Sequence, residues 1–357
     1  MKAWVLHGIN DIRYETVDAP GISAHEVLVS VKAAGICGSD IPRIYQTGAH
    51  THPLIPGHEF AGVVVRCGEK ADQSLAGARV GVFPLIPCKQ CVPCKKHQYE
   101  MCRNYSYLGS RKDGGFAELV AVPAANVIRL PDSVSFEEAA MLEPMAVAVH
   151  AMRRITPATT DTVTVCGLGT IGLLLVMFLR EAGVENILVI GNKEFQKHTV
   201  LERLNLHVGE DNYCDSRTQD IAEWIADRTG GKGTDVFFEC VGKNDTFSSS
   251  VDCTAPAGRI CLVGNPYSDM ELEKPVYWKI LRNQLNITGT WNSSFSYAGN
   301  DNSRNTDDWE YVLERLAAKR IEPGKLISHR FALADLERGL SIMRDKSEDY
   351  IKVMNIL

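Results

Sequence analysis

A glycine-rich turn between an apolar strand and a helix constrains the fold of this chain more than any other feature. The stretch VTVCGLGTIG carries Gly167, Gly169 and Gly172 in a G-x-G-x-x-G pattern. The first glycine permits a tight turn, the second lets the backbone approach a pyrophosphate, and the third allows close packing of helix on strand. Amide donors at the start of such a helix bind phosphate. The pattern therefore predicts a dinucleotide site formed by these glycines with Thr170 and Ile171.

Strand-like and helix-like segments alternate from residue 162 onward. Apolar runs such as NILVIG, TDVFFE and GRICLVG are typical of strands, whereas TIGLLLVMFLREAG and FQKHTVLERLN are typical of helices. Strands joined by helices predict a doubly wound parallel sheet. We therefore expect an α/β nucleotide-binding domain over residues 151–289.

The rest of the sequence predicts a second, β-rich domain. Residues 1–130 contain short strand-like runs punctuated by glycine and proline. The segment SFEEAAMLEPMAVAVHAMRRI indicates a helix that begins with a capping box of Ser135 and Glu138. The tail holds an amphipathic helix and ends in the strand-like YIKVMNIL. We expect the tail to pack on the first domain, so that residues 1–150 and 290–357 form one discontinuous unit.

Composition narrows the class of protein. At 357 residues the chain can bury two cores, and its net charge of −6 argues against a nucleic-acid surface. It begins without a signal-peptide pattern and holds no apolar run of membrane-spanning length, so we expect a cytoplasmic protein. The 11 cysteines are an odd number and most lie singly, which favours reduced thiols over disulfides.

Four of those cysteines gather in one short segment, IPCKQCVPCKKHQYEMC. Four thiolates suit tetrahedral zinc, and a site with four protein ligands leaves no position for substrate. Ordinary buried cysteines would need apolar surroundings, whereas this loop is rich in lysine. Iron–sulfur clusters also use four cysteines, but their common spacings differ from this one. We therefore predict a structural zinc site on Cys88, Cys91, Cys94 and Cys102.

A second set of ligand-type side chains lies outside that loop. GICGSD carries Cys37, PGHEFAG carries His58 and Glu59, and Glu143 stands before Pro144 in an otherwise apolar helix. A sulfur, an imidazole and a carboxylate leave one zinc position open for water or substrate, as catalysis requires. Each fragment alone is weak, because a lone cysteine after a strand is more often part of a core. A buried glutamate in that helix would need a partner, and a metal ion is one.

The chain resembles the zinc-dependent medium-chain dehydrogenases over essentially its whole length. The matching motifs, in order, are GICGSD, GHE at 57–59, the four-cysteine loop, DGGFAE at 113–118, EP at 143–144 and the glycine turn. The resemblance implies a GroES-like catalytic domain beside the Rossmann domain. It also implies a catalytic zinc on Cys37, His58 and Glu143, with Glu59 as a further ligand or as the residue that holds zinc water.

Within this family, GSDIPRIYQTGAH and LEPMAVAVH look most like the polyol and polyol-phosphate dehydrogenases. That likeness implies reversible oxidation of a secondary alcohol to a ketose or ketose phosphate, and we expect a homodimer or homotetramer. Ser39, two residues after the zinc cysteine, could carry the proton out or could be an ordinary turn serine. Many relatives have a histidine five residues after that cysteine, whereas this chain has Pro42, so the exit must use Glu59, water or another group.

The end of the second strand predicts the choice of nicotinamide. A carboxylate there normally binds the ribose 2′-hydroxyl of NAD, but this strand ends in Gly191, Asn192 and Lys193. A glycine followed by a cation suits a 2′-phosphate, so we expect NADP(H) to be favoured over NAD(H). The alternative is that Lys193 is an ordinary solvated charge, partly cancelled by Glu194.

A phosphorylated substrate would need cationic donors near the pocket. Arg43, Arg111 and Lys112 are candidates, and Trp291 with Asn292 could line the far side, although each could equally be a surface residue. Other classes of protein remain as alternatives: a zinc ribbon for nucleic acid, which the acidic charge disfavours, or a cofactor-binding protein that lacks catalytic zinc. Among enzymes, the alternative is a dehydrogenase of an unphosphorylated polyol or a simple secondary alcohol.

Overall fold

The chain divides into two compact units, Met1–Ala146 with Ser293–Leu357, and Val147–Asn292. The computed structural model describes residues 1–204, 206, 208–297 and 307–357. The division falls a few residues from the predicted boundaries, inside the long helix α4 (Leu142–Ile155) and just after the last strand of the second unit. None of the helices described is long and apolar enough to cross a membrane.

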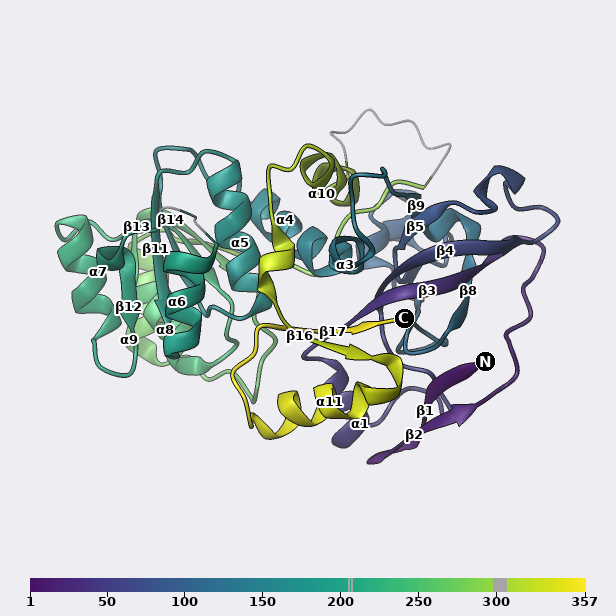
Figure 1. Ribbon diagram of the computed structural model, residues 1–357. Coiled ribbons are helices and arrows are strands. Elements are labelled where there is room, and N and C mark those ends of the chain that lie inside the picture. Colours follow the sequence, from purple (N-terminus) through teal and green to yellow (C-terminus); the bar gives the residue numbers. More distant parts are fainter. Residues whose placement is uncertain (205, 207, 298–306) are drawn as a thin grey trace. The chain divides into compact units, whose positions relative to one another are not determined.

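The first unit is built on a seven-stranded sheet in the order β16-β17-β3-β4-β5-β9, with β8 also paired to β3. Its central strand β3 contributes Val27, Val29 and Val31 to one apolar core, as expected from the alternation of side chains along a strand. The C-terminal β17, yellow in Figure 1, lies antiparallel beside β3, so the tail completes this sheet. The strands of the sheet are β3 (Glu26–Ile36), β4 (Glu59–Cys67), β5 (Arg79–Val82), β8 (Leu119–Pro123), β9 (Val127–Arg129), β16 (Ile327–Ala332) and β17 (Lys352–Ile356).

Smaller elements complete the first unit. The predicted capping box is present at the start of α3, where Ser135 accepts from the backbone N–H of Glu138 and the Glu138 carboxylate accepts in return. Two hairpins pair β1 (Lys2–Gly8) with β2 (Asp11–Thr16) and β6 (Leu85–Ile86) with β7 (Ser106–Tyr107). The helices are α1 (Asp40–Tyr45), α2 (Val92–Lys95), α3 (Phe136–Ala140), α10 (Asp308–Ala317) and α11 (Leu336–Asp345), besides the first residues of α4.

The second unit is the predicted doubly wound sheet. Its six parallel strands run in the order β12-β11-β10-β13-β14-β15, which is the 3-2-1-4-5-6 order of dinucleotide-binding folds. The central strands β10 and β13 are almost wholly buried, as expected for a sheet covered on both faces. The strands are β10 (Thr162–Cys166), β11 (Asn186–Gly191), β12 (Tyr213–Asp215), β13 (Thr234–Glu239), β14 (Thr254–Leu262) and β15 (Asn286–Gly289). The helices are α5 (Thr170–Glu181), α6 (Glu194–His198), α7 (Ile221–Thr229), α8 (Asn244–Cys253) and α9 (Lys274–Arg282).

One predicted helix of this unit is less regular than the sequence suggested. The segment FQKHTVLERLN forms α6 and then a π-helical turn over Thr199–Arg203. At the junction the Thr199 hydroxyl donates to the carbonyl of Phe195, at 2.8 Å. A threonine bonded back to the preceding turn bends a helix, which agrees with the change of helical type there.

Candidate active site

The predicted open metal site lies at one end of the β3–β4 pair. Cys37 follows the last residue of β3, and Glu59, the first residue of β4, pairs with Gly35 of β3. This register brings Cys37, His58 and Glu59 together, with one ligand atom of each within 4.8 Å of the others. Sulfur, imidazole nitrogen and carboxylate oxygen are the donor types that zinc binds in proteins.

Asp40 is a buried carboxylate that organises this group. It lies in the first turn of α1, accepts from the backbone N–H of Cys37 at 3.0 Å, and places Oδ1 3.4 Å from His58 Nδ1. Burial would lower the pKa of His58, but Asp40 and Cys37 outweigh it and hold that pKa well above its usual value. The other neighbour of Asp40 is Arg43, whose Nη1 lies 2.5 Å from Oδ1. Asp40 therefore links the imidazole to a cation that is itself largely buried.

Lys352 supplies a second buried cation from the C-terminal strand β17. Its ammonium donates to the Glu59 carboxylate and, at 3.0 Å, to the carbonyl of Ile36. Burial would lower the pKa of Lys352, but Glu59 and Cys37 outweigh it and raise that pKa. Gly35 makes room for the pair, because a Cβ at this position would overlap both the glutamate and the lysine.

Glu143 reaches the same neighbourhood from the start of α4. Tyr107 donates its hydroxyl to Glu143 Oε1 at 3.1 Å, and the Tyr107 ring lies edge-on to His58 with centroids 5.8 Å apart. Burial, with Glu59 nearby, raises the pKa of Glu143. Glu143 is outside the tight group of three, but its carboxylate is oriented beside it by Tyr107.

Ser39 has a contact that an ordinary capping serine would not have. It is the N-cap residue of α1, yet its side chain makes no cap hydrogen bond. The hydroxyl instead donates to Cys37 Sγ at 3.3 Å. The serine hydroxyl is therefore next to the predicted metal ligand, whereas Pro42, inside α1, offers no group that can transfer a proton.

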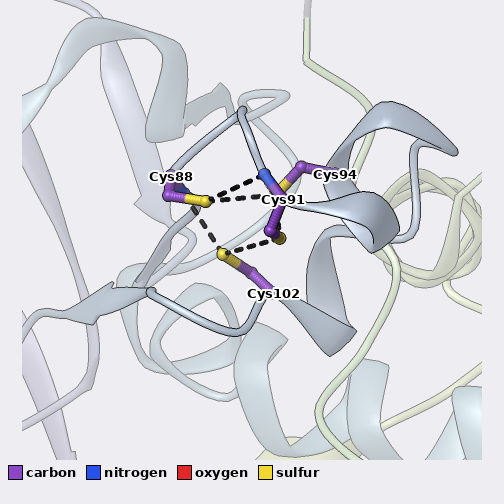
Figure 2. A group of neighbouring side chains, drawn as sticks. All are labelled: Cys88, Cys91, Cys94 and Cys102. Carbon is purple, nitrogen blue, oxygen red and sulfur yellow. Dashed lines mark hydrogen bonds between the residues drawn. The ribbon is translucent and has the colours of Figure 1, made fainter.

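Figure 2 shows the four cysteine side chains of the loop gathered together, two of them from α2 and its N-cap position. The four sulfur atoms lie within 4.8 Å of one another, with Cys91 Sγ 3.4 Å from Cys94 Sγ and 3.9 Å from Cys102 Sγ. Tetrahedral zinc with Zn–S bonds of about 2.3 Å would separate its sulfurs by roughly 3.8 Å. All four are free thiols, and backbone N–H donors lower the pKa of Cys91 to about 6. The geometry fits a closed metal site with no position for substrate.

The glycine turn of the second unit has the form that a pyrophosphate site needs. Gly167 has a φ of +98°, and a Cβ at Gly172 would overlap the carbonyl of Gly167. Gly169 is the N-cap of α5, and a Cβ there would meet nothing within 4 Å. Thr170 and Ile171 form the first turn of this helix. The turn is thus tight where helix meets strand and open where a phosphate would approach.

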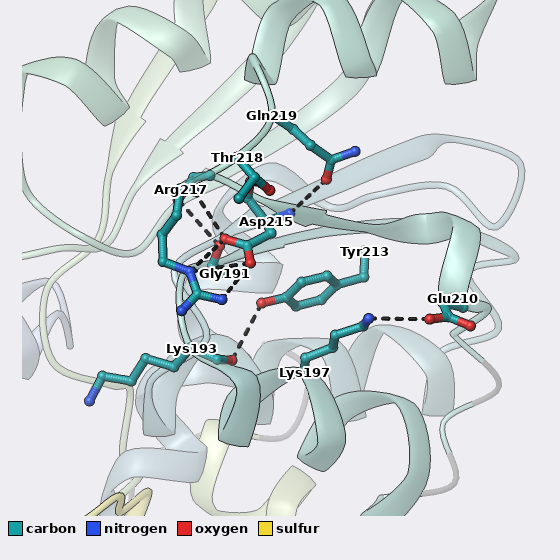
Figure 3. Close-up of polar contacts among 10 residues, drawn as sticks. Gly191, Lys193, Lys197, Glu210, Tyr213, Asp215, Arg217, Thr218 and Gln219 are labelled. Atoms are coloured by element: carbon teal, nitrogen blue, oxygen red, sulfur yellow. Dashed lines mark hydrogen bonds and ion pairs between the residues drawn. The ribbon is translucent and has the colours of Figure 1, made fainter.

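The end of β11 carries the residues predicted to choose the cofactor (Figure 3). Gly191 is buried, and a Cβ there would lie 2.8 Å from the Tyr213 hydroxyl. Asn192 is exposed, and Lys193 is the N-cap of α6 with its carbonyl 3.5 Å from the same hydroxyl. Asp215 of the neighbouring strand is paired in register with Gly191.

The predicted substrate residues are placed as follows. Arg111 stacks on the Tyr105 ring, 4.5 Å from its centroid. Lys112 is exposed and lies 3.5 Å from the Glu26 carboxylate. Trp291 and Asn292 belong to the second unit, where they follow β15. Trp291 is 56% exposed. Arg43, in contrast, is engaged by Asp40 as described above.

Sequence reasoning missed Asp40, Tyr107 and Lys352. Asp40 had a local signal, since an acid three residues after the zinc cysteine can accept from the backbone of that turn. Lys352 is 293 positions from Glu59 and had no such signal. Only the pairing of β17 with β3 brings these two residues together.

Comparisons with known proteins agree with this geometry. The family model of the alcohol dehydrogenase GroES-like domain matches residues 23–132, and that of the zinc-binding dehydrogenase domain matches residues 170–318. Galactitol 1-phosphate 5-dehydrogenase of Escherichia coli K12 is 32% identical over 311 residues, covering 85% of each chain. Sorbitol dehydrogenase of Bacillus subtilis is 30% identical over 365 residues, covering 99% of this chain and 96% of that protein.

Solved structures match over the whole chain. A zinc-binding dehydrogenase from Sinorhizobium meliloti 1021, bound to NADP, has a TM-score of 0.88 at 27% identity and covers 100% of this chain and 99% of its own. The Escherichia coli CFT073 alcohol dehydrogenase RspB, complexed with NADH, has a TM-score of 0.88 at 29% identity, with the same coverage.

Fold, motifs and relatives together define the class: the chain belongs to the zinc-dependent medium-chain alcohol dehydrogenase family. It is accordingly an oxidoreductase that acts on CH–OH groups. The expected GroES-like domain and Rossmann domain are both confirmed.

Proposed function

We propose that this enzyme catalyses reversible oxidation of a secondary hydroxyl of a polyol or polyol phosphate, giving a ketose or ketose phosphate, with NADP(H) as the favoured cofactor. The observation that carries the proposal is the convergence of Cys37, His58 and Glu59 within 4.8 Å, beside the Ser39 hydroxyl. Cys37 and His58 with one carboxylate, from Glu143 or Glu59, would make three ligands and leave a position for a substrate oxygen.

The residues of the site fit a catalytic zinc ion. Cys37 and His58 would hold it, with Glu143 and Glu59 as the carboxylate candidates, and when bound it would act as a Lewis acid on the substrate hydroxyl. Asp40 lies at ion-pair distance from the imidazole, with Oδ1 3.4 Å from His58 Nδ1. Lys352 neutralises Glu59, which favours that carboxylate as an outer group over a direct ligand. The closed four-cysteine site would hold a second zinc ion that stabilises its loop.

Proton exit from the substrate would begin at Ser39. Its hydroxyl donates to Cys37 Sγ and would lie next to the zinc position left open for substrate. A hydroxyl can both donate and accept a hydrogen bond, as a proton carrier must. Pro42 interrupts the route that many relatives use. The next carrier in this proposal is water, because Glu59 is already bound by Lys352.

The preference for NADP(H) is supported by the end of β11. Gly191 provides no carboxylate for a ribose 2′-hydroxyl, and a Cβ there would lie 2.8 Å from the Tyr213 hydroxyl, which leaves little space for a larger side chain. Lys193 begins the following helix, close to where a 2′-phosphate would lie. Structural relatives are bound to NADP in one case and NADH in another, so the choice rests on these residues.

The substrate class is supported by the two enzyme relatives, one named for a polyol phosphate and one for a free polyol. Arg111 is the candidate hydrogen-bond donor to a substrate phosphate. Its guanidinium stacks on Tyr105 and, within the described residues, is not bound to a carboxylate. Lys112, which is paired with Glu26, is the weaker candidate. Trp291 and Asn292 stay predictions for the far side of the pocket.

A second copy of the chain is the proposed partner. Exposed apolar residues gather on and before α9, and α9 is followed by β15, the edge strand of its sheet. The segment also carries Glu271 and Glu273 before the helix and Arg282 at its end. If two copies packed these segments together about a two-fold axis, the acidic start of the segment in one copy would lie beside the basic end in the other. The proposed compartment is the cytoplasm, where thiolate ligands would stay reduced.

A matrix of initial rates tests the proposed function. Galactitol, sorbitol, galactitol 1-phosphate, sorbitol 6-phosphate and 2,3-butanediol would each be oxidised with NADP⁺ and with NAD⁺. We expect the highest kcat/KM for a polyol or polyol phosphate with NADP⁺. Turnover confined to the simple diol would contradict the substrate class, and a higher kcat/KM with NAD⁺ would contradict the cofactor choice.

A further inference from the structure

We propose that Arg217 is a second determinant of cofactor choice: it donates to the 2′-phosphate of NADP(H) and neutralises Asp215, the carboxylate opposite Gly191. This inference rests on the proposed preference for NADP(H). It concerns a turn that no sequence motif marks, between β12 and α7.

The turn is fixed against the end of β11. Asp215, the last residue of β12, is the partner of Gly191 in the parallel register. Ser216 then donates to the carbonyl of Gly191 twice, from its backbone N–H at 3.0 Å and from its hydroxyl at 3.2 Å. Arg217 comes directly after Ser216, and Figure 3 shows its side chain beside Asp215 and Gly191.

Arg217 forms several hydrogen bonds to the Asp215 carboxylate. Its Nε lies 2.9 Å from Oδ1, its Nη2 lies 2.5 Å from Oδ2, and its backbone N–H donates to Oδ1 at 3.0 Å. These bonds lower the pKa of Asp215 to about 2. The sheet thus does hold an acid beside Gly191, on the neighbouring strand, but Arg217 cancels its charge and takes the oxygens that a ribose hydroxyl would need.

The remaining edge of the guanidinium is suited to an anion. Within the described residues, Nη1 of Arg217 has no hydrogen-bond partner, and the side chain is 52% exposed. The bidentate contact with Asp215 holds the planar fork in one orientation, so less rotamer freedom is lost when a phosphate binds. Guanidinium–phosphate bonds are charge-assisted and among the stronger hydrogen bonds in proteins.

Binding of cofactor fragments tests this role without turnover. Isothermal titration calorimetry would give Kd for adenosine 2′,5′-bisphosphate and for 5′-AMP, which differ only in the 2′-phosphate. We expect Arg217→Ala to reduce the preference for the bisphosphate about tenfold or more, corresponding to ~1.4 kcal/mol. The double variant Arg217→Ala/Asp215→Asn should regain part of that loss, because the uncovered carboxylate is removed.

Arg228→Ala is the matched control. It removes another exposed arginine of the same unit, paired with Asp211 at 3.6 Å, and should leave the ratio of the two dissociation constants unchanged. An Arg217→Ala protein that still folds and discriminates as wild type does would overturn the inference. If instead the wild type binds both fragments equally, the proposed NADP(H) preference itself fails, and this result is visible without any variant.

Discussion

Gly191 is the residue at which cofactor choice can be tested by the smallest change. A Cβ added at this position would lie 2.8 Å from the Tyr213 hydroxyl. Gly191→Asp therefore adds bulk where space is short, and it also adds a negative charge. Gly191→Ala adds the bulk alone and is the matched control. We expect the aspartate variant to lower kcat/KM for NADP(H) about tenfold or more below that of the alanine variant, through repulsion of the 2′-phosphate. Equal kcat/KM ratios of the two cofactors in both variants would show that charge at this position does not select.

Arg111 gives the corresponding test for the substrate phosphate. A charge-assisted hydrogen bond contributes about 1.5–3 kcal/mol, so Arg111→Ala should raise KM for a phosphorylated polyol roughly tenfold or more and change KM for the free polyol little. Arg129→Ala, which removes an exposed arginine bonded to Ser74, should affect neither. Equal changes for both substrates would contradict phosphate recognition. Arg43→Ala is less informative, because it also disturbs Asp40 and, through it, His58.

Around the candidate metal site, some side chains could be predicted from the sequence and others could not. The candidate ligands carry local motifs, and the structure brings Cys37, His58 and Glu59 together. Lys352, which sets the charge around Glu59, carries no local motif, because it reaches Glu59 only through the pairing of the last strand with β3. Sequence patterns report periodicity and short-range spacing, whereas such long-range pairs depend on the tertiary fold.

At the scale of elements, the four-cysteine loop is the segment whose structure we expect to depend most on metal. Its regular structure is limited to the short helix α2 and one 3₁₀ turn, and apart from two of the cysteines its buried side chains are Pro87 and Tyr99. Loss of a ligand from a structural zinc site costs several kcal/mol of folding free energy. We expect Cys94→Ser to lower Tm on the order of 10 °C, since 1 kcal/mol shifts Tm by about 2–4 °C for a domain of about 150–250 residues.

The control for that variant is Cys67→Ser. Cys67 ends β4 and lies outside both ligand groups, so its replacement should leave Tm and zinc content nearly unchanged. Identical melting of the Cys94 and Cys67 variants would contradict a structural role of the loop metal.

Most elements of the second unit could be predicted, because burial of its strands and the glycine turn leave strong local patterns. The strands β10, β11, β13 and β14 and the helix α5 form where the sequence indicated them. The π-helical turn after α6 could not be predicted. A π-turn bonds residues five apart where an α-helix bonds residues four apart, and a shift of one residue within one turn leaves no distinct pattern of apolar residues. The turn that holds Arg217 was likewise not marked, because its bonds lead to another strand.

At the scale of the whole molecule, the exposed residues of α9 predict self-association. Tyr277, Trp278 and Leu281 are exposed on one face of this helix, and Trp278 is 55% exposed. Contiguous apolar exposure of this kind marks an interaction surface. Trp278→Glu should therefore shift the mass measured by light scattering toward that of one chain, while Val65→Glu, an exposed apolar position of β4, should not. A wild-type protein with the mass of a single chain would contradict the proposal.

A catalytic zinc ion on Cys37 is tested most directly by the zinc content of the purified enzyme, determined together with its rate of polyol oxidation. The two ligand groups predict two zinc ions per wild-type chain and one in Cys37→Ser, with turnover lost and Tm nearly kept. Cys37→Ser protein that retains two zinc ions and oxidises the substrate at the wild-type rate would contradict a catalytic zinc ion bound by Cys37.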